Sequence, residues 1–141
     1  MTKIQRTASV IVCDDILFGL TGKIFLNGVY TSDITIPGDQ LSLNQLVFYF
    51  TIETPKSKPF KRIILNVTPP YTPAAQYDVP IESVAPIVNQ DRPKMILRAP
   101  LLMQQLVLRP GKIETMVITE SEELDAGGIW ITSVPKFPST P

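Results

Sequence analysis

Two kinds of side chain in this sequence have types and spacing that would permit chemistry. The first kind is carboxylate: Asp14 and Asp15 end one apolar run, and Asp33 begins a later one. Converging carboxylates can bind calcium, which prefers oxygen ligands, or act as the acid pair of a glycosidase. The second kind is aromatic, because Tyr30 and Trp130 can each present a ring and a polar tip to a ligand. These five residues are the candidate ligand or interaction residues, and Trp130 is the candidate stacking platform for a sugar.

Most other chemistry is excluded by composition. The chain has no histidine, which removes the commonest acid–base group, every Ser-His-Asp or Cys-His centre, and all imidazole metal sites. Its single cysteine, Cys13, can form no internal disulfide, and its place in an apolar run predicts a buried, inert thiol. The pair Gly22-Lys23 lacks the other residues of a phosphate loop, and the EF-hand pattern is missing. We therefore expect no enzyme, no cofactor and no metal.

The charge balance excludes two further classes of partner. Thirteen basic and thirteen acidic residues give a formal net charge of zero, so no strong field would gather nucleic acid or an anionic membrane. Only 18% of the residues are charged, against about 25% in an average domain, which predicts apolar surface at an interface. The acidic group at Glu120, Glu122, Glu123 and Asp125 reads as a solvated loop.

Targeting signals are not evident. The segment Met1 to Ala8 is polar and has no apolar signal region, and no apolar run approaches the length of about 20 residues that a membrane helix needs. We therefore expect a cytoplasmic protein.

The elements that would position these residues are strands. Fourteen prolines interrupt the chain, and short runs rich in β-branched and aromatic residues lie between turn signals. This pattern predicts an all-β, two-sheet antiparallel β-sandwich of about eight or nine short strands, with one domain over 1–134 and a proline-rich tail over 135–141. The expected strands are 8–13, 23–30, 32–36, 45–54, 60–68, 95–99, 101–108, 113–119 and 128–134.

Several expectations concern packing. The clearest strand, 45–54, alternates a core row of Leu46, Phe48, Phe50 and Ile52 with an outer row, and we expect it to form a hairpin with 60–68. We expect a turn or brief helical piece over 16–20, a short edge strand near 79–84, and an interruption at Pro100. Inward rows are also expected at Ile34 and Ile36, and at Ile63, Leu65 and Val67.

One stretch resembles a known family. The motif runs from the acidic pair Asp14-Asp15 through Gly22-Lys23 to Gly28-Val29-Tyr30, and Pro59-Phe60 and Pro110-Gly111 continue it. It is similar to a family of small bacterial proteins described only as a domain of unknown function. The resemblance covers about the first half of the chain. It implies a bacterial or phage source and a β-sandwich, and it implies no activity.

Two functions follow from these observations. The first is a non-catalytic module that works through protein–protein contact, with itself as one possible partner, because Ile64, Val107 and Trp130 lie on nominally outer faces. The alternative is a small-ligand, carbohydrate or calcium-binding module that uses Asp14, Asp15, Asp33 and Tyr30 with Trp130. A hydrolase that uses carboxylates alone is a third reading.

Overall fold

The chain is all-β. The computed structural model describes residues 5–80, 82 and 92–134, so the expected tail at 135–141 lies outside the described residues. The described residues form ten strands and one short 3-10 helix, η1 (Leu20–Gly22), and none of them forms a helix long and apolar enough to cross a membrane. The strands are β1 (Thr7–Cys13), β2 (Asp15–Phe18), β3 (Ile24–Asn27), β4 (Ile34–Pro37), β5 (Leu41–Pro55), β6 (Ile63–Thr68), β7 (Ala75–Asp78), β8 (Lys94–Leu108), β9 (Gly111–Thr119) and β10 (Glu123–Val134).

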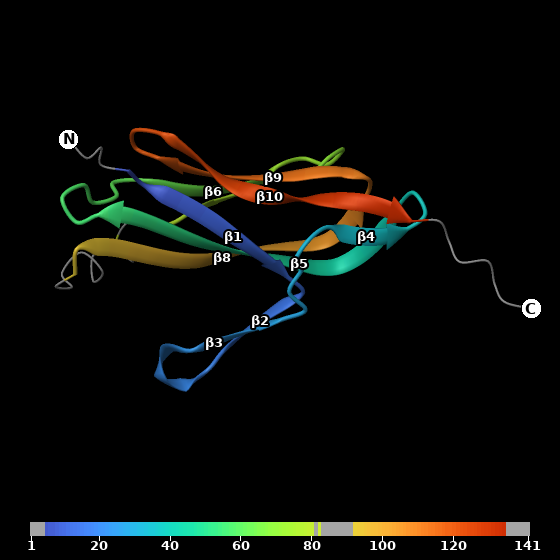
Figure 1. Ribbon diagram of the computed structural model, residues 1–141, viewed down its shortest axis with the longest axis horizontal. Coiled ribbons are helices and arrows are strands. Elements are labelled where there is room, and N and C mark those ends of the chain that lie inside the picture. The colour runs from blue at the N-terminus through green and yellow to red at the C-terminus, as the bar shows by residue number, and fades with distance from the viewer. Residues whose placement is uncertain (1–4, 81, 83–91, 135–141) are drawn as a thin grey trace, which may run out of the picture.

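The strands are arranged in three sheets, not the expected two. The order is β1-β5-β8 in the first sheet and β4-β10-β9-β6-β7 in the second, and β2 and β3 form a separate hairpin that projects from the body (Figure 1). The pairing is not purely antiparallel either, because β4 runs parallel to β10. One of the sheets curls into a half-barrel, as the right-handed twist of long strands favours.

The core lies between the two larger sheets. The predicted row on β5 is confirmed, since Leu46, Phe48, Phe50 and Ile52 are fully buried. On the opposite sheet the predicted rows of β4 and β6 are buried as well. These rows form one continuous apolar cluster with the inner faces of β8, β9 and β10. Strict alternation along each strand therefore determines which face of each sheet meets the core.

The expected hairpin between 45–54 and 60–68 is wrong. Strand β5 pairs with β1 and β8, whereas β6 pairs with β7 and β9 in the other sheet. The loop between them crosses from one sheet to the other, so that their apolar rows face each other across the core. Alternation predicts that each strand has one buried face, but it does not distinguish a neighbour in the same sheet from a partner in the opposite sheet.

Two further expectations near the prolines are corrected. Pro100 does not interrupt a strand, because β8 continues through it and pairs Pro100 with Tyr49. Strand β8 is at the edge of its sheet, where a residue without an N–H is tolerated. The edge strand expected near 79–84 is instead β7, which ends at Asp78, and residues 81, 83 and 84 are outside the described part of the chain.

The two sheets are also joined at one end by a buried arginine. The side chain of Arg6 is only 1% exposed, and its guanidinium lies 4.7 Å from the centre of the Phe60 ring. It donates to Thr54 Oγ1 at 3.0 Å, to the carbonyl oxygens of Lys58 and Pro59 at 3.2 and 3.1 Å, and to the Glu120 carboxylate. Arg6 thus ties the start of β1 and the end of β5 to the turn between β9 and β10.

Glu120 is therefore not part of a merely solvated acidic loop. Burial alone would raise the pKa of its carboxyl, but hydrogen bonds from Arg6 and from the Lys61 N–H, together with the Arg6 charge, lower the pKa from 4.5 to about 2. Glu122 supports the same cation, with an oxygen 3.8 Å from the Arg6 guanidinium. The acidic group provides the counter-charge that makes burial of Arg6 tolerable.

We call the contacts between Arg6 and Glu120 the clasp. The clasp predicts that the free energy of unfolding decreases in acid. The folded pKa of Glu120 is depressed, so its contribution is complete above about pH 4.5 and is lost as the pH falls toward 2. Replacing Glu120 with glutamine should lower the free energy of unfolding at neutral pH by about 2 kcal/mol, less than for a fully buried pair because the carboxylate is partly exposed. It should also flatten the decline between pH 4.5 and 2. Urea denaturation across this pH range measures both effects.

Glu114 is the matched control, because it is an exposed carboxylate on β9. Glu114→Gln should leave both the stability and its pH dependence unchanged. Equal pH profiles for Glu120→Gln and the unmodified chain would show that the clasp does not stabilise the fold.

Candidate interaction site

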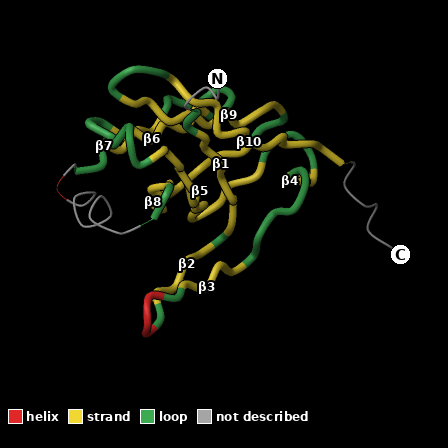
Figure 2. The backbone as a smooth tube through the Cα atoms, turned by 60° about the vertical axis from the view of Figure 1, so that its left-hand side comes forward, coloured by secondary structure: helices red, strands yellow, loops and turns green. Residues whose placement is uncertain are grey.

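The β2–β3 hairpin stands away from the rest of the molecule. We call residues 15–29 the arm; Figures 1 and 2 show it extending from the end of β1, beside the sheet that contains β5 and β8. Its two strands pair Asp15 with Asn27 through to Phe18 with Ile24. The expected turn or helical piece over 16–20 is thus a strand followed by a single 3-10 turn. An isolated two-stranded hairpin is marginal in water, so its base must be held by the body.

Asp14 and its neighbours hold the base of the arm. The Asp14 N–H donates to the carbonyl oxygens of Asn27 and Gly28 at 2.9 and 3.2 Å, which closes the hairpin. The Tyr30 hydroxyl donates to Asp14 Oδ1 at 3.2 Å, and Gln45 Nε2 donates to the Asp14 carbonyl at 3.1 Å and to Asp15 Oδ1 at 3.2 Å. The acidic pair therefore anchors the arm to β5 by hydrogen bonds.

The Cys13 thiol and the Tyr30 hydroxyl at this base favour their neutral forms. Burial raises the pKa of the Cys13 thiol, whose S–H donates to the Asp15 carbonyl at 3.5 Å, and the charges of Asp14 and Asp15 raise it further. Burial and the Asp14 carboxylate likewise raise the pKa of the Tyr30 hydroxyl. Cys13 is buried, as its position in the sequence predicted, and its raised pKa disfavours the thiolate, which is the nucleophilic form.

The three candidate carboxylates do not gather around a common point. Asp14 and Asp15 are engaged at the arm base, and Asp33 instead lines a pocket with Tyr30 and Trp130. Across the described ranges 5–80, 82 and 92–134, no three His, Cys, Asp or Glu side chains are grouped so that they could hold a metal ion. The structure therefore divides the predicted site in two, and gives no support to the calcium alternative.

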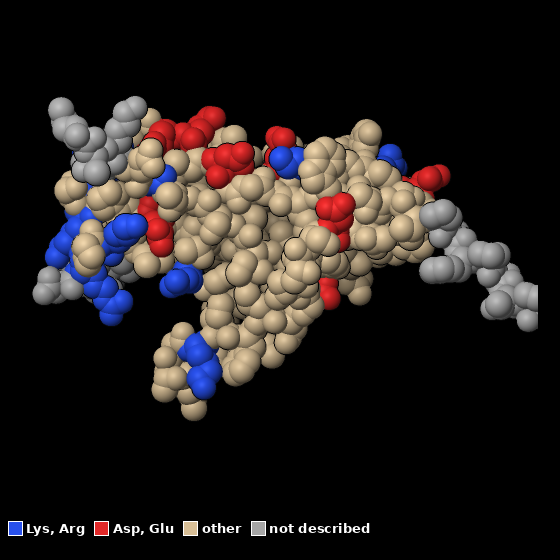
Figure 3. Space-filling model, viewed as in Figure 1, with Lys and Arg blue, Asp and Glu red and all other residues tan. Residues whose placement is uncertain are grey.

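Exposed apolar side chains cover the arm. Leu20 at the tip is 87% exposed and Phe18 is 71% exposed, and Leu17, Phe25 and Val29 are about half exposed. Lys23 is the one charged residue between Ile16 and Ser32, and Figure 3 shows a single basic side chain on the arm. Monomeric proteins rarely expose so continuous an apolar surface, and such surfaces mark interaction sites.

The adjacent outer face of the β1-β5-β8 sheet is also apolar at the end nearest the arm. Register places Ile11 beside Tyr49, and Leu102 beside Val47, while Ile96 lies farther along. Ile11, Leu102 and Ile96 are partly exposed, whereas Tyr49 and Val47 are buried by their neighbours. Figure 3 shows a notch between the arm and the body at this face. We call the exposed residues of the arm and of this face, taken together, the arm surface.

A polar pocket lies on the other side of β1. It has a volume of about 320 Å³ and lies where β1, β10 and the segment 30–33 meet. Tyr30, Asp33 and Trp130, three of the five residues predicted from the sequence, line it together with Thr31, Ser32 and Gly128. The Trp130 side chain is 55% exposed, and the Lys112 ammonium lies 6.0 Å from the centre of its ring.

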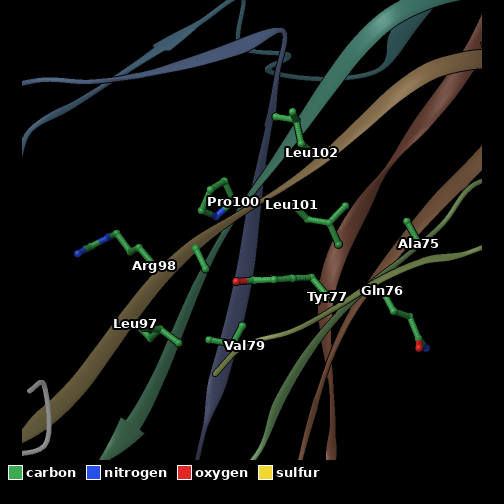
Figure 4. Close-up of a pocket in the computed structure, with 10 residues that line it drawn as sticks. Ala75, Gln76, Tyr77, Val79, Leu97, Arg98, Pro100, Leu101 and Leu102 are labelled. Carbon is green, nitrogen blue, oxygen red and sulfur yellow. The ribbon is translucent and has the colours of Figure 1, made fainter. Parts of the chain in front are cut away.

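A larger groove of about 550 Å³ separates β7 from β8, where the two large sheets do not meet. Its lining is mainly apolar, and Figure 4 shows Tyr77 extending toward β8 while Arg98 extends away from the ring. No labelled charged group points into the groove, so it lacks the convergent polar groups that orient a specific ligand.

Sequence reasoning missed the arm as a separate feature. The sequence did carry a signal for the arm, since residues 16–32 contain a single charged residue. Because apolar strands are usually buried, this run was interpreted as core and turn. Of the residues expected on outer faces, Val107 and Trp130 are exposed, but Ile64 is buried.

Comparisons with protein-family models, curated proteins and solved structures gave no match. The resemblance of the N-terminal motif to a bacterial family therefore stays an expectation, and the functional argument rests on the geometry of this chain.

The arm base predicts different effects at two glycines. Both Gly28 and Gly22 have positive φ, but a Cβ on Gly28 would lie 2.2 Å from Asp14 Oδ2, whereas a Cβ on Gly22 meets nothing within 4 Å. Each alanine variant pays the left-handed backbone penalty of about 1 kcal/mol. Gly28→Ala must in addition displace Asp14, and should lose clearly more stability in chemical denaturation. Equal losses of unfolding free energy for Gly28→Ala and Gly22→Ala would show that the contact between Gly28 and Asp14 does not contribute to stability.

Proposed function

We propose that this protein is a non-catalytic β-module that associates with a second copy of itself through the arm surface. The observation that carries the proposal is the arm, which projects from the body and exposes large apolar side chains on both of its faces. A free hairpin of this composition gains stability only when a partner covers it. The sequence led to the same class of function from the absence of histidine, the low charge and the apolar residues expected on outer faces.

A second copy of the chain fits the arm on both sides. A reciprocal exchange would place each arm in the notch between the arm and the body of its partner. One arm face would then cover the outer face of the partner sheet, and the other would lie against the partner's arm. Exchange of identical elements across a twofold axis is a common route to dimers, because one contact is made twice.

The exposed area of the arm surface is large enough for a dimer interface. The arm surface contains eight partly exposed large residues, on average about half exposed: Ile11, Leu17, Phe18, Leu20, Phe25, Val29, Ile96 and Leu102. At about 200 Å² for a fully exposed large side chain, they offer roughly 800 Å² per copy. An interface of standard size takes about 800 Å² from each partner. The zero net charge of the chain adds no long-range repulsion between copies.

The non-catalytic part of the proposal is supported by the chemistry of the side chains. The sequence contains no histidine, and the single thiol is buried with a raised pKa. The carboxylates at the arm base are engaged in hydrogen bonds that close the hairpin. These groups therefore have structural tasks at the arm base, where Tyr30 and Gln45 contact the carboxylate oxygens.

The proposal predicts a concentration-dependent dimer. Light scattering over a dilution series should give a dimer mass that persists at high salt, because apolar contacts are not screened. Phe18→Ser and Leu20→Ser should each weaken association by at least about 30-fold, since residues at the centre of an interface commonly contribute about 2 kcal/mol or more. Both side chains are exposed, so the variants should retain the stability of the unmodified chain.

Tyr71→Ser is the matched control, because Tyr71 is 78% exposed and lies outside the arm surface. It removes as much exposed ring as Phe18→Ser and should leave the mass unchanged. A monomer at all concentrations would overturn the proposal. So would a dimer whose association is not weakened by either Phe18→Ser or Leu20→Ser. A monomer would direct the search to a different protein as the partner.

A further inference from the structure

We infer that the pocket between β1, β10 and residues 30–33 is a saccharide-binding site, with Trp130 as its stacking platform. This function goes beyond self-association, because the pocket lies on the other side of β1 from the outer face that forms part of the arm surface. Its volume of about 320 Å³ is at the lower end of the range for small-ligand sites.

The first support is a set of unengaged polar groups. The hydroxyls of Thr31 and Ser32 and the carboxylate of Asp33 are exposed at the pocket, and none of them is hydrogen-bonded or ion-paired to another described residue. Three consecutive residues therefore bring donors and acceptors to the lining of the pocket. Most surface polar groups are dispersed, whereas these line one pocket together with an aromatic ring.

The second support is the way the ring is presented. Trp130 lines the pocket from β10, three residues after Gly127, where a bulge shifts the register between Asp125 and Gly127. Bulges commonly re-aim a side chain beside a binding site. The next residue, Gly128, also lines the pocket, and it has φ of +130° and no room for a Cβ, which would lie 2.3 Å from the Ile113 carbonyl oxygen. Glycine thus lets β10 lie close to the β9 backbone at the edge of the pocket.

The third support is electrostatic. The Lys112 ammonium lies 6.0 Å from the centre of the Trp130 ring, at the outer limit of a cation–π contact that would hold the ring in place. The pocket is lined by the single carboxylate of Asp33, and it contains no cationic side chain. A phosphorylated or carboxylated ligand would meet an uncompensated negative charge, whereas a neutral ligand rich in hydroxyls would find acceptors.

A saccharide has the matching chemistry. The apolar C–H face of a pyranose ring can lie on the indole, and its hydroxyls can donate to Asp33 and exchange hydrogen bonds with Thr31 and Ser32. Because carboxylate acceptors form stronger hydrogen bonds than neutral groups, Asp33 should contribute most of the polar affinity.

Trp130 allows a direct test, since it is the single tryptophan of the chain. Its fluorescence should be titrated with glucose, galactose, mannose, N-acetylglucosamine and their common disaccharides. At least one of these should change the emission saturably. Asp33→Asn should weaken that ligand at least tenfold, and Asp39→Asn should not, because Asp39 is an exposed carboxylate that does not line the pocket.

Calorimetry provides a readout that does not depend on fluorescence, and Trp130→Ala should abolish the heat of binding there. The titration should give the same affinity in the Phe18→Ser variant, which separates this site from self-association. No saturable change at about 10 mM, where a site with a Kd of about 1 mM would be nearly full, would overturn the inference. So would equal losses of affinity in Asp33→Asn and Asp39→Asn.

Discussion

The row of four buried side chains on β5 is the contact on which both large sheets depend. Leu46, Phe48, Phe50 and Ile52 have no exposed surface, and their row meets the inner faces of the opposite sheet. Strand β5 is central in its own sheet, so β1 and β8 take their register from it. The alternation of β5 also presents Tyr49 and Val47 on the reverse face, where the arm and its notch are located. The core and the sheet face that contributes to the proposed interface are therefore the two faces of the β1-β5-β8 sheet.

The acidic pair Asp14-Asp15 suggests a catalytic or metal site, but in the structure it holds the base of the arm. Asp14 and Asp15 have the residue types of a metal or glycosidase site, yet their oxygens accept hydrogen bonds from Tyr30, from Gln45 and from the backbone of Ile16. Short polar side chains at a chain reversal satisfy backbone and neighbouring groups in this way. The consequence is a hairpin with a firm base and a free tip.

The parts of the fold that could be predicted from the sequence are those that local alternation determines. The inward rows of β4, β5 and β6, the buried thiol and the all-β class follow from residues that are near neighbours in the chain. Strand pairing does not, because β5 can satisfy its apolar face beside β6 or across from it. The clasp between Arg6 and Glu120 joins residues 114 positions apart and leaves no local signal. For the pocket, the residue types of Tyr30, Asp33 and Trp130 were sufficient to nominate them, but their grouping at a pocket without Asp14 and Asp15 in its lining required the fold.

Pro100 has a consequence for what this chain does at high concentration. Strand β8 is fifteen residues long and lies at the edge of its sheet, which is the kind of edge on which fibrils grow by adding further strands. Proline in the middle of β8 removes one donor from the free side of that edge, because its nitrogen carries no hydrogen. An edge strand that lacks this donor is a poorer template for a further strand than an uninterrupted one would be.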